Sequence, residues 1–166
     1  MTAESGGPAC VERRTRRFFP EDNDTIEHTP GENLEAIEFL HRRLTVEDGA
    51  RAHLAALEKA PAIGFGCDVI SAPMPFQRAL AAALRQDAAA VIACLYPDAS
   101  ALFAARGWTL PPRIGRVYDV SLAAQELGFF AKTDFTAILA ALRSSRPLPF
   151  RHHPEFVSPV LSAQGG

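Results

Sequence analysis

The fold is decided by residues 45–71, which read TVEDGARAHLAALEKAPAIGFGCDVIS. Thr45 followed three residues later by Asp48 is a capping-box pattern, the sequence signature of a helix N-terminus. We expect the helix to end before Pro61, because proline has no N–H to give to a helix interior. Residues 67–71 are mostly apolar and predict a short buried strand.

The helix over residues 46–60 carries its larger apolar side chains on one stripe, which is the pattern of an amphipathic helix. The residues of this stripe are Val46, Ala50, His53, Leu54 and Leu57.

Outside this unit, apolar residues at helical spacing predict further helices. The expected ranges are about 33–41, 77–95, 98–106, 121–127 and 134–144. Val117 and Tyr118 predict a brief strand. Gly128 is expected to end the helix over residues 121–127. Since strands and helices do not alternate regularly, we predict an α+β chain that is mostly helical with a few short strands.

The composition is that of a globular domain. Of the 166 residues, 48% are hydrophobic and 22% are charged, which is close to the average for such proteins. The formal net charge of −2 is the opposite of the basic excess that nucleic-acid binders carry, so no nucleic-acid partner is expected. No apolar run reaches about 18 residues, so no membrane partner is expected either.

The cysteines and the first residues indicate the compartment. Cys10, Cys67 and Cys94 are odd in number and far apart, which fits neither a disulfide framework nor a zinc knuckle. Residues 1–8 lack the basic start and apolar run of a signal peptide. We therefore expect a cytoplasmic location. The apolar neighbours of Cys67 and Cys94 predict that both thiols are buried.

The motif search assigns no catalytic, cofactor-binding or metal-binding residue. Gly64 and Gly66 form a G-x-G pattern, but Val69 occupies the place of the third glycine of a dinucleotide fingerprint. The expected strand follows this turn instead of preceding it, so a simple turn is the better interpretation. His152 and His153 are adjacent in a loop, which is not a ligand spacing for a metal.

Arginines near the ends of expected elements are the better binding candidates. Arg43 precedes the capped helix, and Arg113 and Arg116 flank the brief expected strand. A planar guanidinium pairs with phosphate through two parallel hydrogen bonds. We take these three residues as candidates for substrate binding. The alternative for each is solvated surface charge.

Two segments resemble one enzyme family. Residues 41–53, HRRLTVEDGARAH, are similar to the R-D-Y-I-H-V-D-D-V-A-x-A-H stretch of NAD-dependent epimerase/dehydratases, which are extended short-chain dehydrogenase/reductases. Residues 116–129, RVYDVSLAAQELGF, resemble their D-x-S-K-A-x-x-x-L-G-W element. Residues 69–72 resemble the Y-N-V-G strand, and residues 17–21 resemble a strand end of one branch. The order and spacing match over residues 13–150.

The resemblance implies a domain organisation. Residues 13–150 correspond to the C-terminal, substrate-binding portion of an extended Rossmann-type enzyme, without its N-terminal nucleotide-binding half. Residues 1–12 are expected to be a disordered lead-in, and residues 151–166 a tail. The family's Tyr-x-x-x-Lys pair is missing, because Tyr96 is followed four residues later by Ser100 and Tyr118 by Leu122. The chain therefore has no assignable hydride-transfer residues.

The function that the resemblance implies is that of an NAD(P)-dependent epimerase/dehydratase-like oxidoreductase acting on a sugar or nucleotide-sugar. In this interpretation the chain is a truncated or split gene product, inactive alone, whose partner is a cofactor-binding half or a second copy. NAD or NADP belongs to the implied parent and not to this chain. The alternative is a non-catalytic anion- or sugar-binding or protein-interaction module derived from the same lobe.

Overall fold

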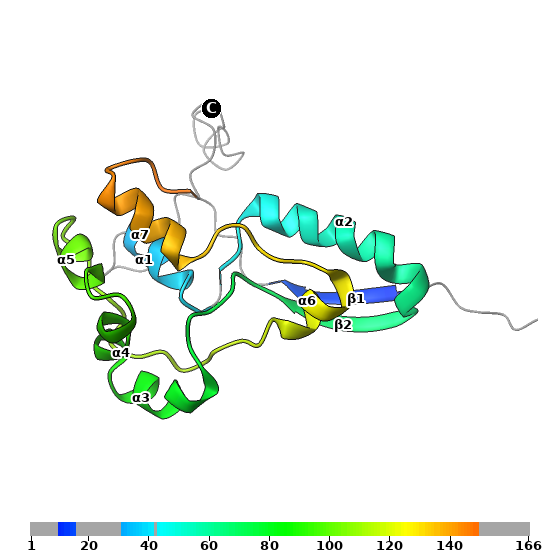
Figure 1. Ribbon diagram of the computed structural model, residues 1–166, viewed down its shortest axis with the longest axis horizontal. Coiled ribbons are helices and arrows are strands. Elements are labelled where there is room, and N and C mark those ends of the chain that lie inside the picture. Colours follow the sequence, from blue (N-terminus) through cyan, green and yellow to red (C-terminus); the bar gives the residue numbers. More distant parts are fainter. Residues whose placement is uncertain (1–9, 16–30, 42, 150–166) are drawn as a thin grey trace, which may run out of the picture.

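The computed structural model describes residues 10–15, 31–41 and 43–149, and Figure 1 shows two distinct ends. At the sheet end, strands β1 (Cys10–Thr15) and β2 (Phe65–Ile70) lie against helix α2 (Val46–Ile63), with α6 (Ser121–Leu127) beside them. At the helical end lie the other five α-helices. The prediction of a mostly helical α+β chain is confirmed.

The helical end is built from short helices with one 3₁₀ turn. Their bounds are α1 (Gly31–Glu38), the turn Arg78–Leu80, α3 (Ala81–Gln86), α4 (Ala88–Leu95), α5 (Ala99–Ala104) and α7 (Phe135–Arg143).

The two strands pair in parallel, with Cys10 opposite Phe65 and Thr15 opposite Ile70. Parallel strands need a crossover connection, and here α1 and α2 lie between them in the chain. The assignment of residues 10–12 to a disordered lead-in is wrong, because these residues begin β1. This strand was not predicted because six residues are too few to show a clear alternation of apolar and polar side chains.

The expected strand at Val117 and Tyr118 is also absent, and the described segment 113–120 has no regular structure. The N–H of Tyr118 donates to Sδ of Met74 at 3.0 Å. That donor is therefore turned toward a side chain and not toward a neighbouring strand.

Helix α2 begins as the capping pattern predicts. Thr45 has extended backbone angles, and its Oγ1 accepts a hydrogen bond from the Asp48 N–H at 3.2 Å. The predicted end before Pro61 is wrong, because the helix runs three residues further, to Ile63. Pro61 removes one N–H donor near the end of the helix. Gly64 then ends the helix at φ 74°, where its N–H donates to the Ala60 carbonyl.

The buried face of α2 is its small-residue face. Gly49, Ala52 and Ala56 are buried, and this helix packs on both strands and on α6. The apolar stripe expected to mark the amphipathic face points outward instead, and its Leu57 is 73% exposed. Small side chains allow the close approach of a helix to a neighbouring element, so size and not hydrophobicity selects the packed face here.

The expected single helix over residues 77–95 is divided at Asp87. This residue has φ −150° and ψ 86°, and its Oδ1 accepts from the Ala90 N–H at 3.0 Å. An aspartate with this geometry is an N-cap, so α3 ends and α4 begins at the same residue. Asp134 caps α7 in the same way, at the predicted start of that helix, and Gly128 closes α6 at φ 63° as predicted.

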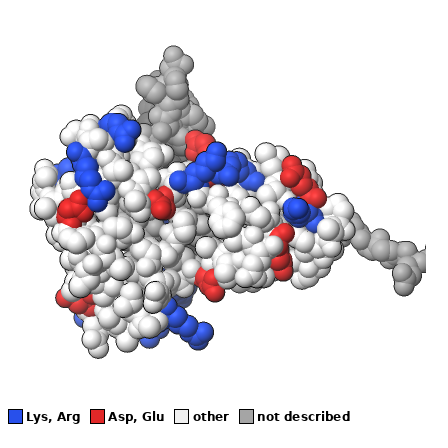
Figure 2. Space-filling view, in the orientation of Figure 1, with Lys and Arg blue, Asp and Glu red and all other residues white. Residues whose placement is uncertain are grey.

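No helix in the described part of the chain is long and apolar enough to cross a membrane. Figure 2 shows one face of the molecule, on which basic and acidic side chains are interspersed and separated by wide uncharged areas. On this face, charge of one sign is therefore not gathered over a single element.

Candidate functional site

A pocket of about 940 Å³ lies at the carboxyl end of β2, between the sheet end and the helical end. Its walls come from residues 69–85, 114–124 and 129–131. The pocket therefore lies where the chain leaves the sheet, with Val69 and Ile70 of β2 among its lining residues.

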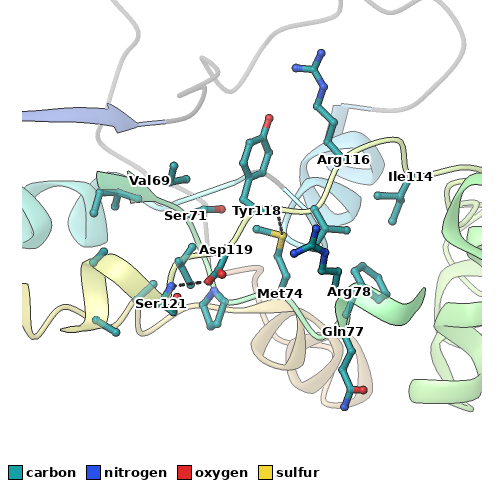
Figure 3. A pocket seen from close by; sticks show the side chains of 18 of the residues that line it. Val69, Ser71, Met74, Gln77, Arg78, Ile114, Arg116, Tyr118, Asp119 and Ser121 are labelled. Atoms are coloured by element: carbon teal, nitrogen blue, oxygen red, sulfur yellow. Dashed lines mark hydrogen bonds between the residues drawn. The ribbon is translucent and has the colours of Figure 1, made fainter. Parts of the chain in front are cut away.

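The lining of the pocket is largely apolar. Met74 and Phe76 follow β2, Ile114 lies on the segment that leads to α6, and Phe129 comes after that helix. Figure 3 shows Arg116 and Tyr118 projecting to the same side of this segment, as alternate residues of an extended chain do, while Asp119 turns toward Ser121. Apolar walls with a few placed polar groups are typical of small-molecule pockets.

The charged residues that line the pocket, within the described part of the chain, are Arg78, Arg85, Arg116 and Asp119. All three arginines are exposed. They can therefore offer guanidinium groups to a bound anion without first losing a buried partner. The excess of positive charge favours an anionic ligand over a neutral one.

Asp119 remains ionised at neutral pH. The hydroxyl of Ser121 lowers the pKa of the Asp119 carboxyl, and so does the Ser121 N–H, which donates to its Oδ1 at 2.9 Å. These bonds turn the carboxylate toward the start of α6. Asp119 therefore contributes a fixed negative charge at one side of the pocket, opposite in sign to the arginines.

Of the three arginines singled out from the sequence, only Arg116 lines the pocket. Arg113 is exposed and is not part of the lining. Arg43 is 6% exposed and lies 3.3 Å from Glu35 and 3.5 Å from Glu38. Its guanidinium is engaged in a buried ion-pair cluster.

Arg43 supports the pocket through its backbone. The carbonyl oxygen of Arg43 accepts from the Ala72 N–H at 2.9 Å and from the Ser71 hydroxyl at 3.3 Å. Both donors lie just beyond β2, where the strand meets the pocket. Arg43 thus fixes the chain that forms one wall.

Arg78 and Arg85 were missed at the sequence level. Arg78 lies on the 3₁₀ turn and Arg85 on α3, and both line the pocket together with Arg116. No local motif marks them, because only the fold brings residues 78–85 and 114–124 to the same pocket.

The described residues offer no fit for a dinucleotide or a metal. Gly64 joins the end of α2 to β2, and Phe65 and Gly66 are the first two residues of that strand, whereas a pyrophosphate needs a glycine turn between a strand and a helix N-terminus. The described residues hold no group of three potential metal ligands, and His152 and His153 lie outside them. Cys67 and Cys94 are exposed, contrary to prediction; Cys67 alternates onto the strand face opposite the buried Ile70.

Fold and pocket together define a mostly helical α+β chain with an arginine-lined pocket at the end of a parallel strand pair. A comparison of the chain with protein-family models, with curated proteins and with solved structures finds no match.

Proposed function

We propose that this pocket binds a nucleotide-sugar or a related sugar phosphate. We further propose that the chain is the substrate-binding part of an NAD(P)-dependent epimerase/dehydratase-like oxidoreductase. The observation that carries the proposal is the meeting of Arg78, Arg85 and Arg116 around one largely apolar pocket. Guanidinium groups suit a diphosphate, and apolar walls suit the flat faces of a base and a sugar.

The sequence resemblance and the pocket support each other. Residues 69–72 and 116–129 resemble two separate elements of the family, and members of both segments line the same pocket. The volume of about 940 Å³ lies within the range of small-molecule sites. It suits a ligand of nucleotide-sugar size better than a single phosphate.

In this proposal the chain binds its ligand but does not turn it over. NAD(P) bound to a separate half would supply hydride transfer. This chain's own residues hold the phosphates and exclude water from the apolar walls. The exposed Leu54 and Leu57, which are three residues apart on the outer face of α2, favour such a partner, because neighbouring exposed apolar side chains mark contact sites.

The test is a calorimetric titration of the chain with UDP-glucose, NAD and NADP, using Arg116→Ala and Arg113→Ala. Both arginines are exposed and lie three residues apart, but only Arg116 lines the pocket. We expect UDP-glucose to bind the wild-type chain, and Arg116→Ala to weaken binding about tenfold or more, as loss of a charged hydrogen bond does. Arg113→Ala should bind as the wild type does.

Equal losses in the two variants would indicate general charge attraction and contradict a specific arginine site. Binding of NAD with no binding of UDP-glucose would contradict the proposed ligand class. Binding of UDP-glucose without any activity in the presence of a cofactor-binding half would favour the alternative, a non-catalytic sugar-binding module.

A further inference from the structure

Asp48 is a buried carboxylate that accepts three hydrogen bonds, one from its own helix and two from a distant segment. It is 2% exposed and lies in the first turn of α2. Its Oδ1 accepts from Nη1 of Arg51 at 2.6 Å. Its Oδ2 accepts from the backbone N–H groups of Lys132 at 3.0 Å and Thr133 at 3.1 Å.

These contacts exceed what a helix start requires. In a capping box, the carboxylate three residues into the helix returns to the N–H of the capping residue. Here Thr45 makes its half of the box with the Asp48 N–H, but the carboxylate reaches across the fold to residues more than eighty positions away. Asp48 therefore joins the start of α2 to the segment between α6 and α7.

That segment forms one wall of the pocket. Phe129, Phe130 and Ala131 line the pocket, and the next two residues are the ones that Asp48 holds. Residues 128–134 have no helix or strand to fix them. The Phe129 N–H donates to the Ala123 carbonyl at 3.3 Å at one end of this segment, and the hydrogen bonds to Asp48 fix the other end.

Arg51 extends the same support to an aromatic ring. The Arg51 guanidinium carbon lies 5.7 Å from the centre of the Phe129 ring, within the range of a cation–π contact. Asp48 holds this guanidinium by a charge-assisted bond. One carboxylate therefore fixes the backbone after the wall and, through Arg51, a side chain within it.

We infer that Asp48 is a positioning residue for the pocket, which sets the Phe129–Ala131 wall without touching the ligand. The inference rests on the proposed function for the identity of the ligand, but not for the ordering of the wall. Asp48→Asn isolates this role, because an amide has the same shape, one acceptor oxygen and no charge. Its NH₂ group must then face either Arg51 or the two backbone donors, so the hydrogen bonds on that side of the side chain are lost.

The first measurement is backbone amide hydrogen exchange without ligand, in the wild type, Asp48→Asn and the control Ile138→Val. Ile138 is a buried residue of α7, and its truncation lowers global stability modestly without touching the wall. We expect Asp48→Asn to speed exchange at residues 128–131 about tenfold while α7 changes much less. Ile138→Val should change both regions together.

The second measurement is the Kd for UDP-glucose in a double-mutant cycle with Phe130→Ala. We expect Asp48→Asn to raise the Kd about tenfold in the wild-type background and much less once the Phe130 ring is gone. Such non-additivity means that one residue acts through the other. A purely structural role for Asp48 predicts equal effects in both backgrounds.

Uniform exchange changes in Asp48→Asn, matching those of Ile138→Val, would overturn the inference. So would an unchanged Kd in folded Asp48→Asn protein. If the wall alone loosens but the wild type binds no UDP-glucose, then the proposed function fails and the positioning role stands.

Discussion

The two ends of the molecule bury apolar surface very differently. The helical end encloses large side chains, including Phe39, Phe103 and Phe135, all at most 1% exposed. The sheet end has a smaller buried cluster, in which Ala52, Ala56 and Ala123 pack with a few larger residues such as Ile70, and larger apolar side chains on α2 and β2 remain exposed. Burial of large side chains is thus concentrated at the helical end, whereas α2 and β2 at the sheet end keep large apolar side chains exposed.

General rules for sheets agree with this contrast. A two-stranded sheet is only marginally stable without further packing, and parallel sheets are usually covered on both faces. One face of β2 carries the buried Asp68 and Ile70, and the other carries the exposed Phe65 and Cys67. The pocket lies between the two ends, so a bound ligand contacts both and should stabilise them together.

The strongest challenge to this comparison is a pair of large-to-small substitutions. Phe135 is fully buried and makes an edge-on contact with Tyr96 at 5.3 Å between ring centres. We expect Phe135→Ala to lower the free energy of unfolding by about 3–5 kcal/mol. The control Leu57→Ala should change it by less than about 0.5 kcal/mol, as measured by urea unfolding. A comparable loss at Leu57 would mean that the outer face of α2 is covered in solution.

A second substitution, at Asp68, measures how much a buried carboxylate lowers the free energy of unfolding at the sheet end. Asp68 is 0% exposed, and neither carboxylate oxygen has a hydrogen-bond donor among the described residues. We expect Asp68→Val to raise the free energy of unfolding by about 1–3 kcal/mol, the usual cost of a buried unsatisfied group. Asp68→Asn should raise it less, because the amide is still polar. Destabilisation by Asp68→Val in urea unfolding would show that the carboxylate contributes to the fold.

The smallest expected effect is a pH dependence at the helical end. Nε of Arg143 donates to Oδ2 of Asp98 at 2.6 Å, and this bond lowers the pKa of Asp98 below its usual 3.8. The carboxyl binds protons more weakly in the folded state, so the pair stabilises the protein above pH 3.8 and loses this contribution as the pH falls through the lowered pKa. Both groups are exposed, so the contribution is small.

Asp98→Asn should therefore lower the melting temperature slightly at neutral pH, and not at a pH where the wild-type carboxyl is protonated. A difference that persists unchanged at acidic pH would assign the effect to something other than the ion pair.

Local features of the fold were predictable because their causes are local. Thr45 and Asp134 cap their helices through bonds to residues three positions away, and Gly128 ends α6 with a positive φ. The division at Asp87 has an equally local cause, but the uninterrupted alanine and leucine pattern concealed it. Strong helix propensity on both sides of a cap predicts one helix where the chain makes two.

The pocket was much less predictable, because its members meet only through packing. Arg116 was identified as an anion-binding candidate and lines the pocket, whereas Arg43 is engaged in a buried ion-pair cluster. Both have the same chemistry and a similar place near an element's end. Arg43 is buried because it pairs with Glu35 and Glu38. No single sequence motif contains all three residues, so this pairing could not be predicted.

The helical α+β class and the main helix starts follow from the amino-acid sequence alone, since each depends on spacing within a few residues. Three features emerge only from the packed fold: the buried face of α2, the arginines that share a pocket, and the hydrogen bonds between Asp48 and residues 132 and 133. These outcomes depend on side-chain size and on contacts between distant segments. A local pattern carries no information about either.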